Sequence, residues 1–226
     1  MGAMIALTRA FQRLDQKLKV GDWESQWSIG TQAPTLWPEL AGKTLGILGF
    51  GHIGKALTRR ALAFDMKVCA VRRRAQSDAP QGLMFIGGPE RVDELLALSD
   101  YLAITLSLSQ ETRGLIDARR LALMKRSAYL INVARAEIVD ERPLYDALAG
   151  GGLAGAALDV WYRYPKSAGN TAPATAPFHE LSNVIMTPHI SGWTEGMLEA
   201  RAGVIAENIS RTARGEPPLN AITAAD

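Results

Sequence analysis

Three polar residues with catalytic chemistry each stand at the end of a short apolar run. Arg135 follows AYLINVA, Asp159 lies near the end of GAALDV, and His189 closes NVIMTPH. A guanidinium group can hold a carboxylate, an imidazole can transfer a proton near neutral pH, and a carboxylate can accept hydrogen bonds from a polar ligand. We therefore treat all three as candidate site residues. Structural alternatives are that Arg135 caps a helix, Asp159 braces a loop and His189 is a satisfied core histidine.

A fourth apolar run, TLGILG, leads into a glycine-rich turn. Gly49, Gly51 and Gly54 follow the pattern Gly-x-Gly-x-x-Gly between an expected strand and an expected helix. The first glycine of such a unit permits a tight turn, the second lets a pyrophosphate approach the backbone, and the third lets the helix pack on the strand. The pattern predicts a dinucleotide-binding turn; glycines that only shape a turn are the alternative. His52 is expected to be an exposed, variable position there rather than a catalyst.

The residues after the next apolar run, KVCAV, bear on which dinucleotide binds. Sites selective for NAD usually have Asp or Glu at this point, but here the chain continues with Arg72, Arg73 and Arg74. Guanidinium groups suit a 2′-phosphate by charge and geometry, so this cluster favours NADPH over NADH, with NAD still possible. A solvated basic turn that contacts no ligand is the alternative.

Alternating strands and helices must position these residues. The expected strands are TLGILG, KVCAV, YLAITL, AYLINVA, GAALDV and NVIMTPH, with helix-like segments such as RVDELLALSD, DARRLALMK and ERPLYDALAGG among them. This alternation predicts an α/β fold, a Rossmann-type doubly wound parallel sheet with helices on both faces. Ligands bind beyond the carboxyl ends of the strands in such sheets, so the three polar candidates should face the same crevice as the glycine turn.

We expect the chain to divide into three segments: residues 1–43, 44–192 and 193–226. In the first, the apolar stripe of residues 3–20 predicts a helix that needs a partner, and the Trp- and Pro-containing stretch after it predicts a crossing loop. The second is the dinucleotide-binding domain. The third is a C-terminal helix over about 193–213 with a tail that would return to the substrate domain named below. Each helix is predicted from an apolar face. The residues of these faces are Met4, Leu7, Phe11, Leu14 and Leu18 in the first helix, Ile53, Ala56, Leu57, Ala61 and Phe64 in the helix after the glycine turn, and Met197, Val204 and Ile205 in the last.

Composition limits the classes of function. The chain has 226 residues, 47% hydrophobic and 21% charged, with a net charge of +2. A full core can be buried, and without a basic face interleaved with aromatics a nucleic-acid partner has little support. No apolar stretch reaches membrane-spanning length and no signal-peptide pattern opens the chain, so we expect a soluble, cytoplasmic protein without a membrane partner. The lone Cys69 is expected to be a buried small hydrophobe.

The ordered motifs resemble those of the D-isomer-specific 2-hydroxyacid dehydrogenase family. The resemblance extends from about Gly21 to about Asn220 through WPELAGKTLGILGFGHIG, SLSQETRGLI, NVARAEIVD, GAALDV and NVIMTPHISG. It implies hydride transfer between NAD(P)H and C2 of a small 2-keto acid such as glyoxylate or hydroxypyruvate, no metal, and a homodimer. By motif, Arg135 would hold the substrate carboxylate, His189 would protonate the alkoxide and Asp159 would contact the nicotinamide carboxamide. The remaining cofactor contacts would come from His52, Ile53, Thr105, Ser107, Thr112, Val133 and Gly192.

The chain departs from the family pattern at several positions. Tyr164 stands where the family usually has a Glu that pairs with the histidine, and a neutral phenol cannot stabilise an imidazolium as a carboxylate does. The formate dehydrogenase branch, which needs no acid catalyst, also lacks this Glu. We hypothesise that keto-acid reduction fades at lower pH here than in a relative with the Glu; an unchanged pH–rate profile in Tyr164→Glu would refute this. Smaller departures are Ala136 for Gly and Ser107 for Pro.

The largest departure lies before the glycine turn. Family members begin with a substrate domain, whereas residues 1–43 leave room only for a helix and a loop, so we expect most of that domain to be absent. Two interpretations follow from this. The chain is an NADP-preferring 2-hydroxyacid dehydrogenase, as Arg135 and His189 suggest, or it is a cofactor-binding and dimerisation module without turnover, as the missing domain and Tyr164 suggest.

Overall fold

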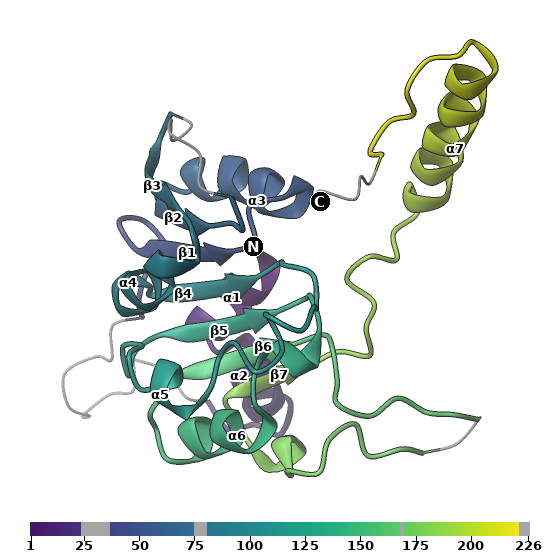
Figure 1. The fold of residues 1–226 in the computed structure, drawn as a ribbon. Helices are drawn as coiled ribbons and strands as arrows, with labels where there is room; N and C mark the ends of the chain where they lie inside the picture. Colours follow the sequence, from purple (N-terminus) through teal and green to yellow (C-terminus); the bar gives the residue numbers. More distant parts are fainter. Residues whose placement is uncertain (24–36, 75–80, 168–169, 222–226) are drawn as a thin grey trace. The chain divides into compact units, whose positions relative to one another are not determined.

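The strands of the chain assemble into one parallel sheet. A computed structural model describes residues 1–23, 37–74, 81–167 and 170–221. Its seven strands lie in the order β3-β2-β1-β4-β5-β6-β7 (Figure 1). Their bounds are β1 (Thr44–Leu48), β2 (Lys67–Val71), β3 (Leu83–Gly87), β4 (Tyr101–Ile104), β5 (Tyr129–Asn132), β6 (Gly155–Leu158) and β7 (Val184–Met186). The predicted Rossmann-type doubly wound sheet is confirmed, and the strand order reverses its direction between β1 and β4.

One strand, β3, was not among the expected strands. Its sequence LMFIG lies between Gly82 and Gly88, and glycines of this kind indicate a loop. Parallel pairing with β2 nevertheless gives the segment its strand conformation. Pairing of this kind is a tertiary effect that local sequence does not report.

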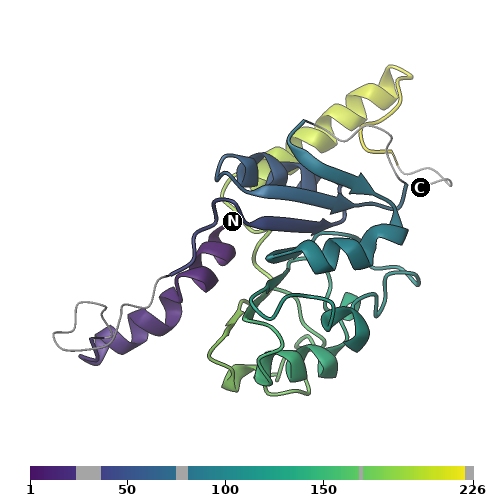
Figure 2. The ribbon, with the colours of Figure 1, turned by 90° about the vertical axis from the view of Figure 1, so that its left-hand side faces the viewer.

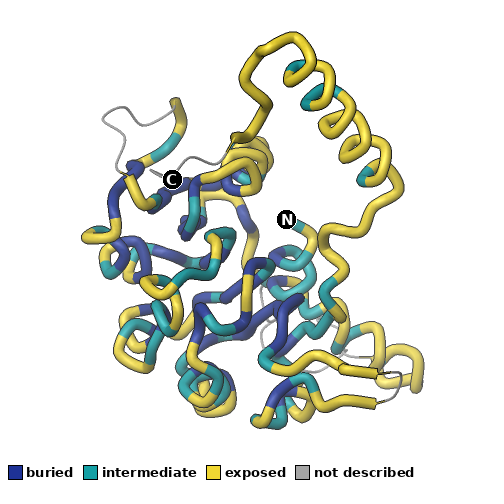
Figure 3. The backbone as a smooth tube through the Cα atoms, turned by 45° about the vertical axis from the view of Figure 1, so that its right-hand side comes forward, coloured by how far each residue is buried: buried dark blue, intermediate teal, exposed yellow. Residues whose placement is uncertain are grey.

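Helices cover both faces of the sheet. The α-helices are α1 (Gly2–Thr8), α2 (Phe11–Lys19), α3 (His52–Leu62), α4 (Val92–Leu98), α5 (Ala118–Leu121), α6 (Glu141–Ala149) and α7 (Met197–Ala213), and the short 3-10 turns are η1 (Pro89–Arg91), η2 (Ala136–Ile138) and η3 (Phe178–Glu180). Successive side chains of β1 enter different cores: Ile47 packs in a cluster with Met4 of α1, whereas Leu48 packs in one with Leu95 of α4. The buried residues follow the strands (Figure 3). Two-sided burial explains why the strands are continuously apolar.

The prediction of one helix over residues 3–20 was wrong. The helix breaks at Ala10, whose φ of 47° is left-handed, and two helices result. α1 packs on β5, β6 and β7, and Thr8 at its end hydrogen-bonds to the buried Tyr101 hydroxyl at 2.6 Å. α2 instead projects away from the sheet (Figure 2) and has no buried residue in a span that is wholly described. Periodicity missed the break because alanine favours helix.

The apolar face predicted for the helix after the glycine turn was also wrong in part. α3 turns Gly54, Thr58 and Ala61 to the sheet, while Ile53 remains 59% exposed. Small residues at this spacing let the helix lie close to β1. Close packing thus decided the face, and it leaves Ile53 on the outside of the turn.

Cys69 on β2 is buried, as predicted. Burial raises the pKa of its thiol to about 12. The thiol therefore stays protonated at neutral pH and packs as an apolar side chain.

The chain divides into two compact units, Met1–Pro188 and His189–Asp226. The sheet and its covering helices belong to the first unit. In the second, α7 is the main element, and none of its residues, all of which are described, is buried. Across the described ranges no helix combines the length and apolar character needed to cross a bilayer. The segment boundaries at residues 43 and 192 stay predictions, and residues 24–36 of the crossing loop lie outside the described residues.

Candidate functional site

The last residues of six strands pair with one another across the sheet, so these strands end at the same level. Leu48 of β1 pairs with Val71 and Ile104, and the pairing continues through Asn132, Leu158 and Met186. The residues that follow each strand therefore emerge at one edge of the sheet. They are Gly49, Arg72, Thr105, Val133, Asp159 and Thr187. In parallel α/β sheets this carboxyl edge is where ligands bind.

The three glycines of the turn at this edge differ in what surrounds them. Gly49 has a φ of 101°, and a Cβ there would lie 2.5 Å from the Leu106 backbone nitrogen. A Cβ at Gly54 would lie 2.5 Å from the Gly49 carbonyl oxygen, so α3 could not lie so close. At Gly51 a Cβ would meet nothing within 4 Å. The first and third glycines thus serve the protein's own packing, while the second faces open space.

The first turn of α3 leaves backbone donors available beside this space. His52 and Ile53 are both exposed at the start of the helix, and no side chain of the described chain caps it. Uncapped N–H groups at a helix N-terminus carry a partial positive charge and suit an anion. The turn therefore provides a backbone cradle that an added Cβ at Gly51 would fill.

Thr105, directly after β4, fixes the turn from the neighbouring strand. Its hydroxyl donates to the Gly49 carbonyl oxygen at 2.6 Å and its N–H donates to the Leu48 carbonyl oxygen at 2.8 Å. Further along this loop, the Thr112 hydroxyl donates to the Ser107 carbonyl oxygen at 2.9 Å. Thr105 and Thr112 therefore shape the backbone on this side of the turn.

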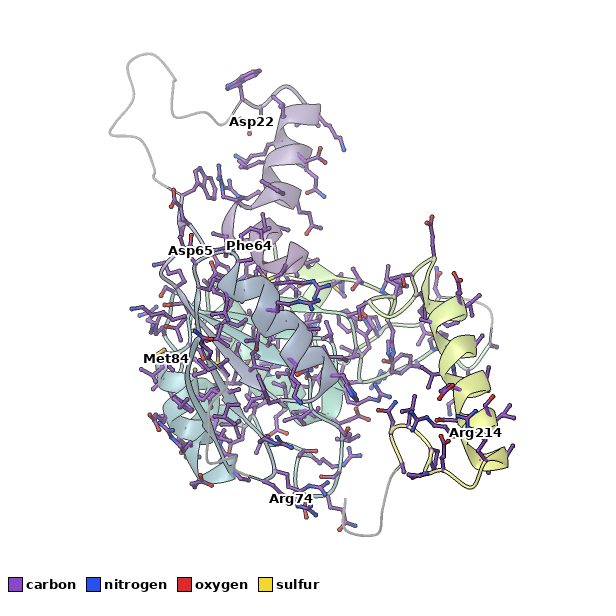
Figure 4. All side chains as sticks on the ribbon, turned by 90° about the horizontal axis from the view of Figure 1, so that it is seen from above. Asp22, Phe64, Asp65, Arg74, Met84 and Arg214 are labelled. Atoms are coloured by element: carbon purple, nitrogen blue, oxygen red, sulfur yellow. The ribbon has the colours of Figure 1, made fainter. Side chains whose placement is uncertain are left out.

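The three arginines lie at the carboxyl end of β2. The Arg72 N–H donates to the Gly87 carbonyl oxygen at 3.0 Å, which continues the pairing with β3 by one residue. Arg72 is half-buried, and Arg73 and Arg74 are exposed. Figure 4 shows Arg74 at the end of the sheet opposite to Phe64, which follows α3. The cluster thus shares the carboxyl edge with the glycine turn.

Arg135 is carried by a short loop after β5. The loop is held by Asn132, which is 2% exposed and whose side-chain amide donates to the Arg135 carbonyl oxygen at 3.0 Å. The Asn132 side-chain oxygen accepts from the Ala134 N–H at 3.0 Å. The Arg135 side chain is exposed, and its guanidinium donates to the Ala134 carbonyl oxygen at 2.6 Å. Val133 beside it is half-buried against the α1 face of the sheet.

Asp159 is buried at the end of β6 and is hydrogen-bonded on two sides. Its N–H donates to the Asn132 carbonyl oxygen at 3.0 Å, and its carboxylate accepts from the Thr187 hydroxyl. Burying a carboxylate is costly unless it is hydrogen-bonded, so these contacts explain how an acid is tolerated here. Arg135 and Asp159 are therefore both tied to Asn132.

Tyr164 lies in the loop that follows β6. Its hydroxyl accepts from the Trp161 backbone N–H at 3.3 Å, and its ring is partly exposed. Trp161 is buried, and its indole N–H donates to the Thr187 carbonyl oxygen at 2.8 Å. Tyr164 thus supports the residue that holds Thr187.

His189 and Gly192 belong to the second unit. His189 is half-buried and has a φ of 59°, a left-handed backbone that histidine adopts more readily than most residues. A Cβ at Gly192 would meet nothing within 4 Å. Within the first unit, the structure brings the glycine turn, Thr105, Arg135 and Asp159 to one edge.

Sequence reasoning did not single out three residues that organise this edge: Asn132, Trp161 and Thr187. Asn132 left a signal, because it is a polar residue at the end of the apolar strand YLIN and buried polar groups need partners. Trp161 and Thr187 left no comparable signal, since their mutual bond spans 26 positions of the sequence.

This fold and turn define the class of the protein as a Rossmann-type dinucleotide-binding domain. The open space at Gly51, the uncapped helix start and the exposed arginines fit a dinucleotide phosphate by charge and by shape. More particularly, the chain belongs to the family of the D-isomer specific 2-hydroxyacid dehydrogenase NAD binding domain, whose model matches residues 1–191. The resemblance in the motifs is thereby confirmed.

Individual relatives agree with the family. The chain is 36% identical over 216 residues to a glyoxylate reductase of Pyrococcus furiosus. The matched region covers 95% of this chain and 61% of the relative. A D-isomer specific 2-hydroxyacid dehydrogenase of Xanthobacter autotrophicus, solved with NADPH and MES, has a TM-score of 0.79, 30% identity and coverage of 97% and 83%. An NADPH-dependent glyoxylate/hydroxypyruvate reductase of Sinorhizobium meliloti, solved with NADP and sulfate, has a TM-score of 0.80, 25% identity and coverage of 98% and 66%. The chain thus spans less than two thirds of the glyoxylate reductase's length.

Proposed function

We propose that this chain provides the NAD(P)H-binding and catalytic residues of an oxidoreductase acting on a small 2-keto or 2-hydroxy acid of the glyoxylate or hydroxypyruvate type. A bound nicotinamide would supply the hydride that reduces C2 of the keto acid. The observation that carries the proposal is the shared carboxyl edge of the sheet. Gly49, Arg135 and Asp159 lie just after the ends of β1, β5 and β6, and these strands end at the same level of the pairing register.

In this proposal Arg135 binds the substrate and His189 handles the proton. The exposed guanidinium of Arg135 would pair with the substrate carboxylate and polarise the keto oxygen. His189 would donate a ring proton to that oxygen as negative charge develops on it, which completes the hydroxyl group of the product. Both roles rest on family motifs that the chain retains.

Asp159 and Tyr164 have supporting roles in the proposal. Asp159 would accept a hydrogen bond from the nicotinamide carboxamide while Thr187 holds its carboxylate in place. Tyr164 occupies the position of the family's Glu and supplies a neutral hydroxyl there. A hydroxyl can orient a histidine but cannot stabilise its charged form as a carboxylate does.

The cofactor we propose is NADPH in preference to NADH. The glycine turn with Ile53 and the loop residues Thr105, Ser107, Thr112 and Val133 would hold the dinucleotide, with Gly192 as a further contact. Arg72, Arg73 and Arg74 would bind the 2′-phosphate, because several guanidinium groups at one edge favour a dianion. The Sinorhizobium meliloti relative is described as NADPH-dependent, which supports this preference.

We also propose that the protein forms a homodimer through α2. Phe11 and Leu18 on this helix are 53% and 52% exposed, and Trp23 beyond it is exposed too. Phe11, Leu14 and Leu18 line a shallow groove together with Gln12 and Asp15. An apolar face of this kind is costly in water and typical of a protein interface.

Turnover by the purified, folded chain tests the proposed function. The assay follows oxidation of NADPH and of NADH, in parallel, with glyoxylate and with hydroxypyruvate. We expect turnover that His189→Ala abolishes and Arg135→Ala weakens mainly through a higher KM. Binding of NADPH without turnover would contradict the reductase activity and leave a cofactor-binding module.

A further inference from the structure

Thr187, two residues before the proposed proton donor, is held at all three of its hydrogen-bonding groups. Its N–H donates to the Leu158 carbonyl oxygen at 3.0 Å, its hydroxyl donates to the Asp159 carboxylate, and its carbonyl oxygen accepts from the Trp161 indole N–H at 2.8 Å. All three partners lie in the stretch where the chain leaves β6. Sheet pairing needs only the first bond, so the other two fix Thr187 further.

The bond from Trp161 restrains one backbone torsion of Thr187. The Thr187 carbonyl belongs to the planar peptide that joins it to Pro188, so holding its oxygen sets ψ of Thr187. The proline ring then locks φ of Pro188 at about −65°. Of the three soft torsions between the Cα atoms of Thr187 and His189, only ψ of Pro188 remains. The indole donor thus fixes one of the two torsions that the proline ring leaves free before His189.

Trp161 is itself held firmly enough to act in this way. Its side chain is 5% exposed, and its ring meets Phe178 edge-on with centroids 6.3 Å apart. Its backbone N–H is bound by the Tyr164 hydroxyl at 3.3 Å. A donor whose rotamer is locked by packing can define the position of a neighbouring group.

We propose that Trp161 is a positioning residue for His189. Through the Thr187 carbonyl it restrains the backbone that leads to His189, so it would act on the proton donor through another residue. The inference rests on the proposed function, in which His189 is the proton donor.

Two phenylalanine variants test the proposal kinetically. Trp161→Phe keeps a ring against Phe178 and removes the indole donor. Tyr162→Phe is the matched control, because Tyr162 is the next residue and its hydroxyl donates to the Val139 carbonyl oxygen at 2.8 Å. Each variant loses one hydrogen bond from an aromatic side chain to a backbone carbonyl oxygen.

Misplacing a catalytic group lowers the rate of the chemical step, so Trp161→Phe should lower kcat about 10- to 100-fold. Its KM and its Kd for NADPH should stay within about twofold, as expected when only the transition state is affected. Tyr162→Phe should keep kcat at the wild-type value. Equal losses of kcat in the two variants, or full kcat in Trp161→Phe, would overturn the proposal.

Histidine NMR gives a readout that needs no turnover. The chain has 3 histidines, so the ring signals of His189 can be assigned with His189→Gln. Trp161→Phe should shift these signals, and Tyr162→Phe should not. Pro188→Ala, at an exposed site, releases the second restraint without disturbing the core and should shift them too. His189 signals that stay unchanged in both Trp161→Phe and Pro188→Ala would overturn the positioning role, whereas absent turnover with shifted signals would contradict only the proposed function.

Discussion

The side chain of Asn132 binds the main chain of Arg135, with 3.0 Å between the amide nitrogen and the carbonyl oxygen. The backbone carbonyl of Asn132 also accepts from the Asp159 N–H at 3.0 Å. One buried amide residue therefore fixes the loop that carries the proposed substrate-binding guanidinium and joins it to the strand end that carries the proposed carboxamide contact.

Replacing Asn132 by Asp should weaken both stability and substrate binding. The carboxylate keeps an acceptor for the Ala134 N–H but loses the donor to Arg135, and it becomes a buried charge. We expect a loss of about 1–3 kcal/mol in the free energy of unfolding. The KM for the keto acid should rise as well, as measured by steady-state kinetics beside urea unfolding.

Asn183→Asp is the control for this prediction. The Asn183 amide donates to the Leu148 and Ala154 carbonyl oxygens, before β7 rather than at the carboxyl edge. It should lower stability and leave KM unchanged. A KM that rises equally in both variants would show that Asn132 acts only through stability.

Alanine at Gly49 and at Gly51 should separate folding from cofactor binding. At Gly49, a φ of 101° and the clash with Leu106 should cost about 3 kcal/mol or more of stability. At Gly51, φ is −89° and the added methyl meets no protein atom within 4 Å, so the fold should be kept. The methyl would occupy the proposed pyrophosphate space, and the Kd for NADPH should rise roughly tenfold or more, about 1.4 kcal/mol.

Thermal unfolding and NADPH titration of both variants check this prediction. Gly51→Ala with full NADPH affinity would place the cofactor phosphate away from the turn. Gly49→Ala with wild-type stability would mean that the turn can rearrange around Leu106.

The sequence made the sheet and the glycine turn predictable because both leave local patterns. Buried parallel strands are continuous apolar runs, and the three glycines recur within six residues of one strand-to-helix turn. The break at Ala10 depends on docking of Thr8 against Tyr101, 93 positions away, and the face of α3 depends on how closely Gly54 approaches β1. Likewise, Trp161 finds its partner only when β6 and β7 are paired. Contacts between distant residues of this kind leave no periodic trace.

Removing the two exposed arginines after β2 should lower affinity for NADPH more than for NADH. Arg73→Ala/Arg74→Ala removes two charges that the proposal places at the 2′-phosphate. The Kd for NADPH should rise about 10- to 100-fold, or 1.4–2.8 kcal/mol, since a charged partner is lost from a phosphate. The Kd for NADH, measured by the same titration, should barely change.

Arg59→Ala/Arg60→Ala is the matched control for net charge. Both residues are exposed in the last turn of α3, away from the carboxyl edge. NADPH affinity should survive in this variant. Equal losses in the two double variants would mean that general electrostatics, and not phosphate recognition, explains any preference.

The ion pairs of Asp93 should make stability depend on pH in acid. Arg119 and Arg120 donate to its carboxylate and lower its pKa from 3.8 to about 2. Because the folded-state pKa lies below the unfolded one, the stabilisation is present above about pH 4 and is lost as the pH falls toward 2. Asp93→Asn should therefore be less stable than wild type at neutral pH, by a small amount since the pair is exposed, and equal to it near pH 2.

Urea unfolding at several pH values measures this effect. Arg119→Gln/Arg120→Gln removes the partners and should give the same pH dependence as Asp93→Asn. Adding Asp93→Asn to that variant should change little further. If the stability difference between Asp93→Asn and wild type persists unchanged down to pH 2, Asp93 acts through helix packing and not through its charge.

A charge on the apolar face of α2 should separate the proposed dimer into monomers. Leu18→Asp places a carboxylate among Phe11, Leu14 and Leu18, and burying it in an interface without a partner is costly. Gln16→Asp is the control, because Gln16 is exposed on the same helix but does not line the groove. Light scattering across a dilution series should give a dimer for wild type and Gln16→Asp and a monomer for Leu18→Asp. Since α2 contributes no buried residue to the first unit's core, all three proteins should unfold alike once monomeric. A wild-type monomer, or a Leu18→Asp dimer, would contradict the α2 interface.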